Sequence, residues 1–163
     1  MPTMSRSMRH LRWSDDRFFG AIAEVPAEAL QARYSPDAWT VSALLAHIVS
    51  GAEWYRYCLT GQFWTEFGNP ETGADVEVLR EMLGSLDEGF IAQAELPDDL
   101  MVFQDEHGPS EALRSMLLGQ AVLHAAKHKA QICAALEASG FAAPSLDELD
   151  LWHFASFEAS QGR

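Results

Sequence analysis

The sequence predicts an all-α protein, a four-helix bundle followed by a short fifth helix at its C-terminal end. Apolar residues recur at three- and four-residue steps along four long segments, which is the spacing of one buried helix face. Proline, glycine and hydroxyl-bearing residues stand between these segments as helix stop and start signals. The chain has 163 residues, the size of one domain, so we expect a single domain over residues 1–163.

The first two predicted helices have the length of bundle helices. We expect the first over residues 6–24, where Pro26 prevents its continuation. The second begins near Thr40, a suitable N-cap, and ends at Gly61.

The third helix follows a loop at residues 67–73 and carries apolar residues from Val76 to Phe90, before Pro97. Between residues 98 and 109 the apolar residues no longer follow a helical spacing, and turn-forming residues accumulate. We therefore expect a small hairpin or a loop there.

The fourth helix is expected to begin after Ser110, a candidate N-cap, and to end at Gly140. Its predicted buried stripe consists of Leu113, Leu117, Ala121, Ile132 and Ala135. The charged residues that lie mostly away from this stripe are Glu111, Arg114, Lys127, Lys129 and Glu137. The helix should therefore present one apolar face to the core.

A fifth, shorter helix is expected after Pro144. Ser145 and Glu148 have the spacing of a capping box, in which each side chain bonds the other residue's backbone amide. Its apolar side should carry Leu146, Leu149 and Trp152.

Two histidines, His124 and His128, continue the apolar stripe of the fourth helix through its middle. Residues four apart on a helix lie one above the other, so two imidazoles at this spacing can bind one ion. A buried polar group without a partner costs about 1 to 3 kcal/mol. The pair therefore needs either hydrogen-bond acceptors in the core or a shared metal ion, and the spacing alone leaves both open.

A third metal ligand should come from another helix, because bundles build metal sites from side chains on facing helices. His47 is the candidate, since Gly51 one turn further on leaves room beside its imidazole. Trp54 follows on the same stripe and is a candidate pocket residue. We nevertheless expect most large aromatic residues to belong to the core: Trp13, Trp39, Trp54 and Phe90.

The composition excludes several classes of function. The chain has 24 acidic and 11 basic residues, a net charge of -13, which argues against binding to a nucleic-acid backbone. No apolar run approaches the roughly 18 to 20 residues that span a bilayer, and no signal peptide is recognised. We expect a cytoplasmic protein without a membrane partner. Cys58 and Cys133 lack any metal or redox spacing and should be buried free thiols.

Two histidine-containing blocks resemble the DinB/YfiT-like metalloprotein family. Residues 39–47, which end in Leu-Leu-Ala-His, resemble the start of helix 2 in that family, and residues 59–61 resemble its end. Residues 124–132 resemble the family signature HxxxHRGQI, with Lys129 in place of Arg and Ala130 in place of Gly. The likeness extends over most of the chain, but its specificity lies in these blocks.

The resemblance implies an up-down-down-up bundle, usually a homodimer, in which His47, His124 and His128 hold a divalent ion, with Zn²⁺ and Ni²⁺ as the leading candidates. Lys129 keeps the charge of Arg but lacks its planar fork, so contacts that Arg makes in relatives do not carry over. Gln131 is either a hydrogen-bond partner of a ligand or a structural residue. The other histidines are expected outside the site: His10, His107 and His153.

Three neutral imidazoles leave at least one coordination position open, which is typical of catalytic zinc sites. The family includes transferases and isomerases that use thiols such as mycothiol or bacillithiol. Our leading hypothesis is a metal-dependent enzyme that activates a low-molecular-weight thiol for transfer to a small electrophilic substrate. The alternatives are a metal-dependent hydrolase using bound water and a non-catalytic metal-binding stress-response protein. No catalytic residue can be named from sequence, and Glu53, a candidate acid or base, is expected to be solvated.

Overall fold

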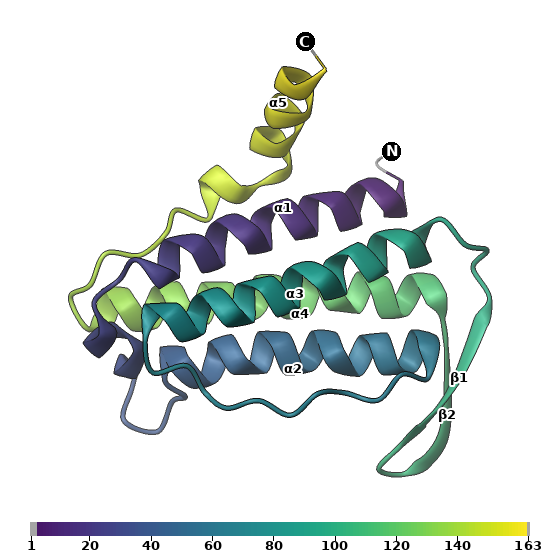
Figure 1. The fold of residues 1–163 in the computed structure, drawn as a ribbon, viewed down its shortest axis with the longest axis horizontal. Coiled ribbons are helices and arrows are strands. Elements are labelled where there is room, and N and C mark those ends of the chain that lie inside the picture. The colour runs from purple at the N-terminus through teal and green to yellow at the C-terminus, as the bar shows by residue number, and fades with distance from the viewer. Residues whose placement is uncertain (1–2, 163) are drawn as a thin grey trace.

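The structure, a computed structural model, describes residues 3–162. Within them the chain is mostly helical and has a small antiparallel sheet (Figure 1). The elements in chain order are α1 (Met4–Ala23), the 3₁₀ helix η1 (Ala27–Gln31), α2 (Val41–Thr60), α3 (Gly73–Ala94), β1 (Leu100–Asp105), β2 (Gly108–Leu113), α4 (Arg114–Ala138), the 3₁₀ helix η2 (Asp147–Leu149) and α5 (Leu151–Gln161). The predicted helical fold, with a hairpin between the third and fourth long helices, is confirmed.

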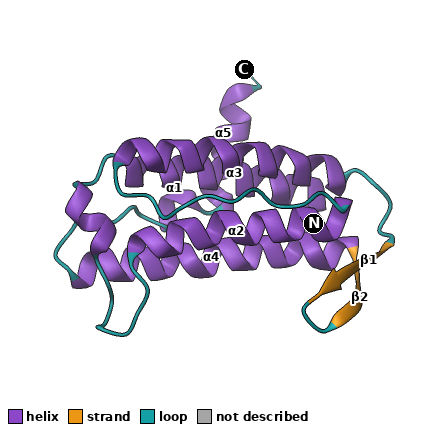
Figure 2. Cartoon of the chain, turned by 60° about the horizontal axis from the view of Figure 1, so that its bottom comes forward, coloured by secondary structure: helices purple, strands orange, loops and turns teal. Residues whose placement is uncertain are grey.

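The four long helices lie side by side (Figures 1 and 2). α1 packs most extensively on α3, and α2 packs on α4. The segment 61–72 runs back along α2, so that α2 and α3 begin at the same end of the molecule (Figure 2). The largest fully buried side chains include Phe18, Phe19, Leu45, Ile48, Phe90, Leu118 and Ile132. These residues come from all four long helices, so the core lies between them.

Local sequence signals explain where α2 and α3 begin and end. The hydroxyl of Thr40 accepts a hydrogen bond from the amide of Ala43 at 3.0 Å, as predicted for an N-cap. Gly61 ends α2 with a φ of 74°, a left-handed conformation that favours glycine. Thr72 and Asp75 form a capping box at the start of α3.

α4 begins later than predicted because the hairpin extends to its first residue. Ser110 lies in β2, where its hydroxyl donates to Asp105 instead of capping a helix. Asp98 accepts a hydrogen bond from the amide of Ser115 at 2.8 Å, which satisfies a free donor in the first turn of α4. Leu113, predicted in the buried stripe, ends β2 and is 40% exposed.

α5 also begins later than predicted, because η2 forms where the helix was expected to start. Asp150 caps α5 by accepting a hydrogen bond from the amide of His153 at 2.9 Å. The predicted capping box of Ser145 and Glu148 is therefore wrong. Trp152, expected on the apolar side, is 82% exposed.

Two charged residues of α4 that were predicted on the polar face are buried, and these predictions are wrong. Arg114 and Lys129 are only 8% and 4% exposed. The ammonium group of Lys129 forms an ion pair with Asp15 of α1, and Asp87 of α3 adjoins the same pair. We call Asp15, Asp87 and Lys129 the core charge cluster. Helical periodicity cannot predict Lys129 inside, because its burial depends on carboxylates from two other helices.

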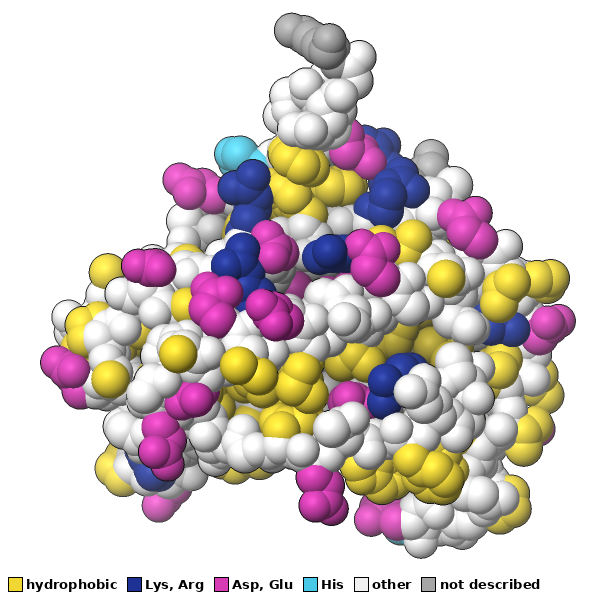
Figure 3. Space-filling model, viewed as in Figure 1, with side chains coloured by type: hydrophobic (Ala, Val, Ile, Leu, Met, Phe, Trp, Pro, Cys, Tyr) yellow, Lys and Arg dark blue, Asp and Glu magenta, His cyan; other side chains and the backbone are white. Residues whose placement is uncertain are grey.

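Ion pairs on the surface connect α1 to α3. Arg12 pairs with Glu88, and Arg80 pairs with Asp16 at 2.9 Å. Basic and acidic side chains lie close together on this face (Figure 3). Exposed pairs of this kind contribute only about 0.2 to 1 kcal/mol each, so apolar packing is the main attraction between these helices.

Both cysteines are buried free thiols, as predicted. None of the helices in residues 3–162 combines the length and apolarity required to cross a membrane.

Candidate metal centre

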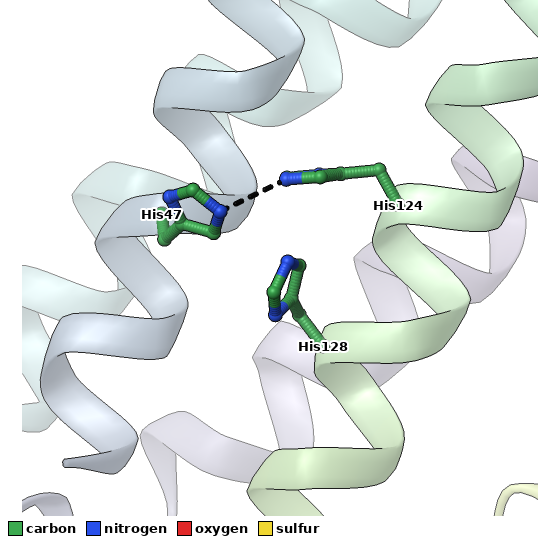
Figure 4. Close-up of side chains that lie close together, drawn as sticks. All are labelled: His47, His124 and His128. Atoms are coloured by element: carbon green, nitrogen blue, oxygen red, sulfur yellow. Dashed lines mark hydrogen bonds between the residues drawn. The ribbon is translucent and has the colours of Figure 1, made fainter. Parts of the chain in front are cut away.

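The structure brings together the three histidines that the sequence singled out. His47 projects from α2, and His124 and His128 project from successive turns of α4 toward it (Figure 4). Each ring offers one nitrogen atom, and these atoms all lie within 4.8 Å of one another. The Nε2 atoms of His47 and His124 are 3.1 Å apart. We call these three residues the histidine triad.

Gly51 makes room for the triad. A Cβ atom at this position would lie 2.3 Å from Cε1 of His124, a distance that side chains do not reach. The residue one turn after His47 must therefore be glycine for His124 to keep its position. The sequence suggested space at this position, and the structure shows that His124 fills it.

Gln131 lies one turn after His128 and contacts its ring. Nδ1 of His128 and Oε1 of Gln131 are 2.6 Å apart. Because an amide oxygen only accepts hydrogen bonds, Nδ1 carries the proton and donates it. Nε2 of His128 is thereby left unprotonated and able to bind a cation.

Burial keeps the imidazoles neutral. It lowers the pKa of His124 to about 4, and the positive charges that His128 and His47 would acquire add to the effect. Burial is also the main reason that the pKa values of His47 and His128 are lowered. Neutral imidazole is the form that binds metal ions.

The donor set fits a divalent metal ion. Two nitrogen atoms that share a tetrahedral zinc ion lie roughly 3.3 Å apart, given zinc–nitrogen distances of about 2.0 to 2.1 Å. The separation of 3.1 Å between the nitrogens of His47 and His124 is close to this value. The three histidines could therefore hold a metal ion.

The lowered pKa of His124 predicts that the metal-free protein loses stability as pH falls from about 6.5 to about 4. In this window an unfolded imidazole binds a proton and the folded one does not, so acid favours the unfolded state by about 3 kcal/mol from this residue. Urea unfolding with a chelator, at pH 7 and pH 4.5, measures the change. A His124→Asn variant is the control, and an equally steep pH profile in this variant would contradict the prediction.

A cavity of about 640 Å³ lies beside the triad, next to His128. We call it the His128 cavity. Its walls come from the segment before α2, from the first turn of α2 and from α4. They consist of Tyr34, Asp37, Ala38, Trp39, Leu44, Lys127, His128, Ala130, Gln131, Ala134 and Ala135. Trp39 is 55% exposed and meets the ring of His47 edge to face, with centroids 4.8 Å apart. The prediction that Trp39 belongs to the core is therefore wrong.

Another cavity, of about 410 Å³, adjoins His47 and His124 and is lined by residues further along α2. Trp54 and Trp64 line it, and Trp54, which was expected in the core, is partly buried against the core as well. Trp64 comes from the segment 61–72 and could not be found from helical periodicity. We call this the tryptophan cavity.

Glu53 also lines the tryptophan cavity, but it is not solvated as predicted. It is 3% exposed and forms an ion pair with Arg56. The guanidinium of Arg56 donates a second hydrogen bond, of 3.0 Å, to the carbonyl oxygen of Phe63. Glu53 and Arg56 thus fix the segment that carries Trp64 against α2.

The remaining histidines lie outside the triad. The ring of His10 is 2.7 Å from the carbonyl oxygen of Leu149, and His153 contacts the carboxylate of Asp150. His107 is exposed at the tip of the hairpin, beside Glu106.

Comparison with known proteins identifies the family. The model of the DinB family matches residues 1–161, nearly the whole chain. No curated protein matches significantly. The match includes both histidine blocks and all helices of the fold, and the chain therefore belongs to the DinB family.

Proposed function

We propose that His47, His124 and His128 bind a divalent metal ion, Zn²⁺ or Ni²⁺, and that Gln131 orients His128 as a ligand. The convergence of three neutral imidazoles from two facing helices carries this proposal. The hydrogen bond from His128 to Gln131 supports it, because ligating histidines usually donate their other N–H to a fixed acceptor.

We infer further that the protein is an enzyme that activates a low-molecular-weight thiol for transfer to a small electrophile. A metal ion in such a site favours the thiolate form of a bound thiol or lowers the pKa of bound water. Separate cavities beside His128 and beside His47 and His124 support a reaction of two small molecules. Trp39, Trp54 and Trp64 would limit access of water to the reacting groups.

The proposed activity is tested by incubating metal-loaded protein with physiological thiols and a panel of electrophiles. We expect loss of free thiol that depends on enzyme concentration and disappears in a His128→Ala variant. Turnover without any thiol would indicate hydrolysis by metal-bound water instead. Metal binding without turnover would indicate a non-catalytic metal-binding protein and contradict the enzymatic proposal.

Replacing Gly51 with alanine should weaken metal binding without changing any proposed ligand. The new methyl group would occupy the space of the His124 ring and force it away from His47 and His128. We expect at least about a tenfold loss of metal affinity, the lower end of the range for disturbed ligand orientation. Competition with a chromophoric chelator measures it. Gly89→Ala is the matched control, because no atom lies within 4 Å of a Cβ there; equal affinities of the two variants would contradict the prediction.

The family arrangement completes the proposal. We propose that the four long helices form an up-down-down-up bundle, supported by the return of the segment 61–72 along α2. We also propose a homodimer, supported by exposed apolar residues on the hairpin and α4: Val102, Met116 and Leu123. Light scattering measures the mass of the assembly.

A cytoplasmic location accords with thiol chemistry, because low-molecular-weight thiols are kept reduced there.

A further inference from the structure

The chain has two lysines, and they flank His128 on α4. Lys129 points into the core charge cluster, where it pairs with Asp15. Lys127 is exposed and lines the His128 cavity together with His128 and Gln131. The two lysines therefore have different surroundings. The ion pair in the core accounts for the position of Lys129, but it does not account for that of Lys127.

Lys127 differs from the other basic side chains in residues 3–162, because it has no ion pair, hydrogen bond or aromatic partner there. Most of the arginines pair with carboxylates: Arg6, Arg9, Arg12, Arg56, Arg80 and Arg114. Arg17 lies over the ring of Trp13, and Arg33 donates to the carbonyl oxygen of Ala38. The ammonium group of Lys127 is thus available to a ligand.

The charge of Lys127 acts on the triad. Lys127 directly precedes His128 in α4 and lines the same cavity, so its charge lies close to the triad. The protein as a whole carries a net charge of -13 and repels anions. An exposed cation in the wall of the cavity offsets this repulsion locally.

The other residues that line the His128 cavity indicate the chemical character of the rest of the ligand. Tyr34, Trp39, Leu44 and several alanines provide mostly apolar contact. Asp37 is the acidic residue of the lining, and no ion pair joins it to Lys127 within residues 3–162. A molecule that fits has an apolar body and one acidic group directed to Lys127.

We propose that the small molecule bound in the His128 cavity carries a carboxylate or similar acid, which Lys127 binds while another part of the molecule reaches the triad. This inference rests on the proposed metal-dependent function for the second contact. It specifies a class of substrate, small organic acids, that metal binding alone does not specify. The acid can belong to the thiol or to the electrophile, and the experiment separates them.

The thiol arm uses Co²⁺-loaded protein, in which a bound thiolate gives a charge-transfer absorption band. The probes are 3-mercaptopropionate and the uncharged 2-mercaptoethanol, titrated into the wild type and Lys127→Met. We expect Lys127→Met to weaken binding of 3-mercaptopropionate about fivefold, as for an exposed ion pair, and to leave 2-mercaptoethanol unchanged. The preference should also decrease at high ionic strength.

The electrophile arm uses 3-phenylpropanoate and 3-phenylpropanamide, with binding followed by NMR in metal-free protein. A preference for the acid that disappears in Lys127→Met would assign the acid to the electrophile. Asp37→Asn is the matched control, because it removes a negative charge from the same cavity and should strengthen binding of the acid. If Lys127→Met binds acidic and neutral probes of both arms as the wild type does, the inference is wrong. If wild-type protein binds neither thiol at the metal, the proposed function fails, and the second arm still tests Lys127.

Discussion

A His128→Ala variant should purify without stoichiometric metal, as should His47→Ala, whereas the wild type should contain about one ion per chain. Removing one of three imidazoles leaves two ligands from different helices, and the site loses the open three-ligand geometry of zinc enzymes. Even loss of an outer partner of a ligand typically costs about 10- to 100-fold in affinity, so loss of the ligand itself should exceed this range. Elemental analysis of protein purified without chelators measures the content.

His153→Ala provides the matched control, because this histidine lies in the first turn of α5, outside the triad, and contacts only Asp150 among acidic residues. It should retain the full metal content. Gln131→Ala should give an intermediate result, since it leaves all three imidazoles in place but removes the acceptor of the His128 proton. Equal metal in wild type, His47→Ala and His128→Ala would show that the ion is bound elsewhere.

A Lys129→Met variant should lose about 3 to 5 kcal/mol of unfolding free energy, the usual cost of removing one partner from a buried ion pair. Asp15 and Asp87 are 2% and 1% exposed, and the ammonium group of Lys129 forms an ion pair with Asp15. Burial and the adjacent Asp15 raise the pKa of Asp87 well above its usual value, which favours its protonated form. With Lys129 absent, Asp15 would be left charged and uncompensated.

Urea denaturation at pH 7 measures this loss, and Lys127→Met is the control two residues away. Lys127 is exposed, so its replacement should change stability by no more than about 0.5 kcal/mol. Adding Asp15→Asn to Lys129→Met should recover part of the loss by removing the unpaired charge. Similar stabilities of the two lysine variants would contradict the proposed role of the core charge cluster.

The raised pKa of Asp87 determines whether the stability contributed by this residue rises or falls with pH. Its folded-state pKa is raised, so the stability that its proton provides is complete below the unfolded pKa and is lost as pH rises through the folded pKa. An Asp87→Asn variant cannot ionise, and its stability should decline less than that of the wild type as pH rises above the usual pKa of an aspartate.

The long helices and their caps were predictable, because their signals are local. α2 begins after Thr40 and ends at Gly61, as the sequence indicated. An N-cap hydroxyl and a left-handed glycine both act within one helical turn. The first residues of α4 and α5 could not be predicted as well from the sequence. Ser110 had the residue type of a cap, but pairing between β1 and β2 determined its conformation.

The histidine triad was predictable because it combines a helical spacing with a family signature. The surrounding cavities were not. Trp64 reaches the site from an irregular segment, and Glu53 is buried by its pairing with Arg56. Lys129 was also predicted at the surface. The periodicity of a helix gives no information about the partners that a side chain finds on other helices.

The return of the segment 61–72 along α2 sets a minimum length for this part of the chain. α2 has 20 residues and is therefore about 30 Å long, whereas twelve extended residues reach at most roughly 40 Å. About nine residues are the fewest that could return to the start of α3. Deletion of more than about three residues would leave the chain too short for α3 to start beside the beginning of α2, and α3 would have to pack in the reverse direction. The length of the segment between Gly61 and Thr72 thus determines the direction in which α3 packs. The same segment also forms one wall of the site.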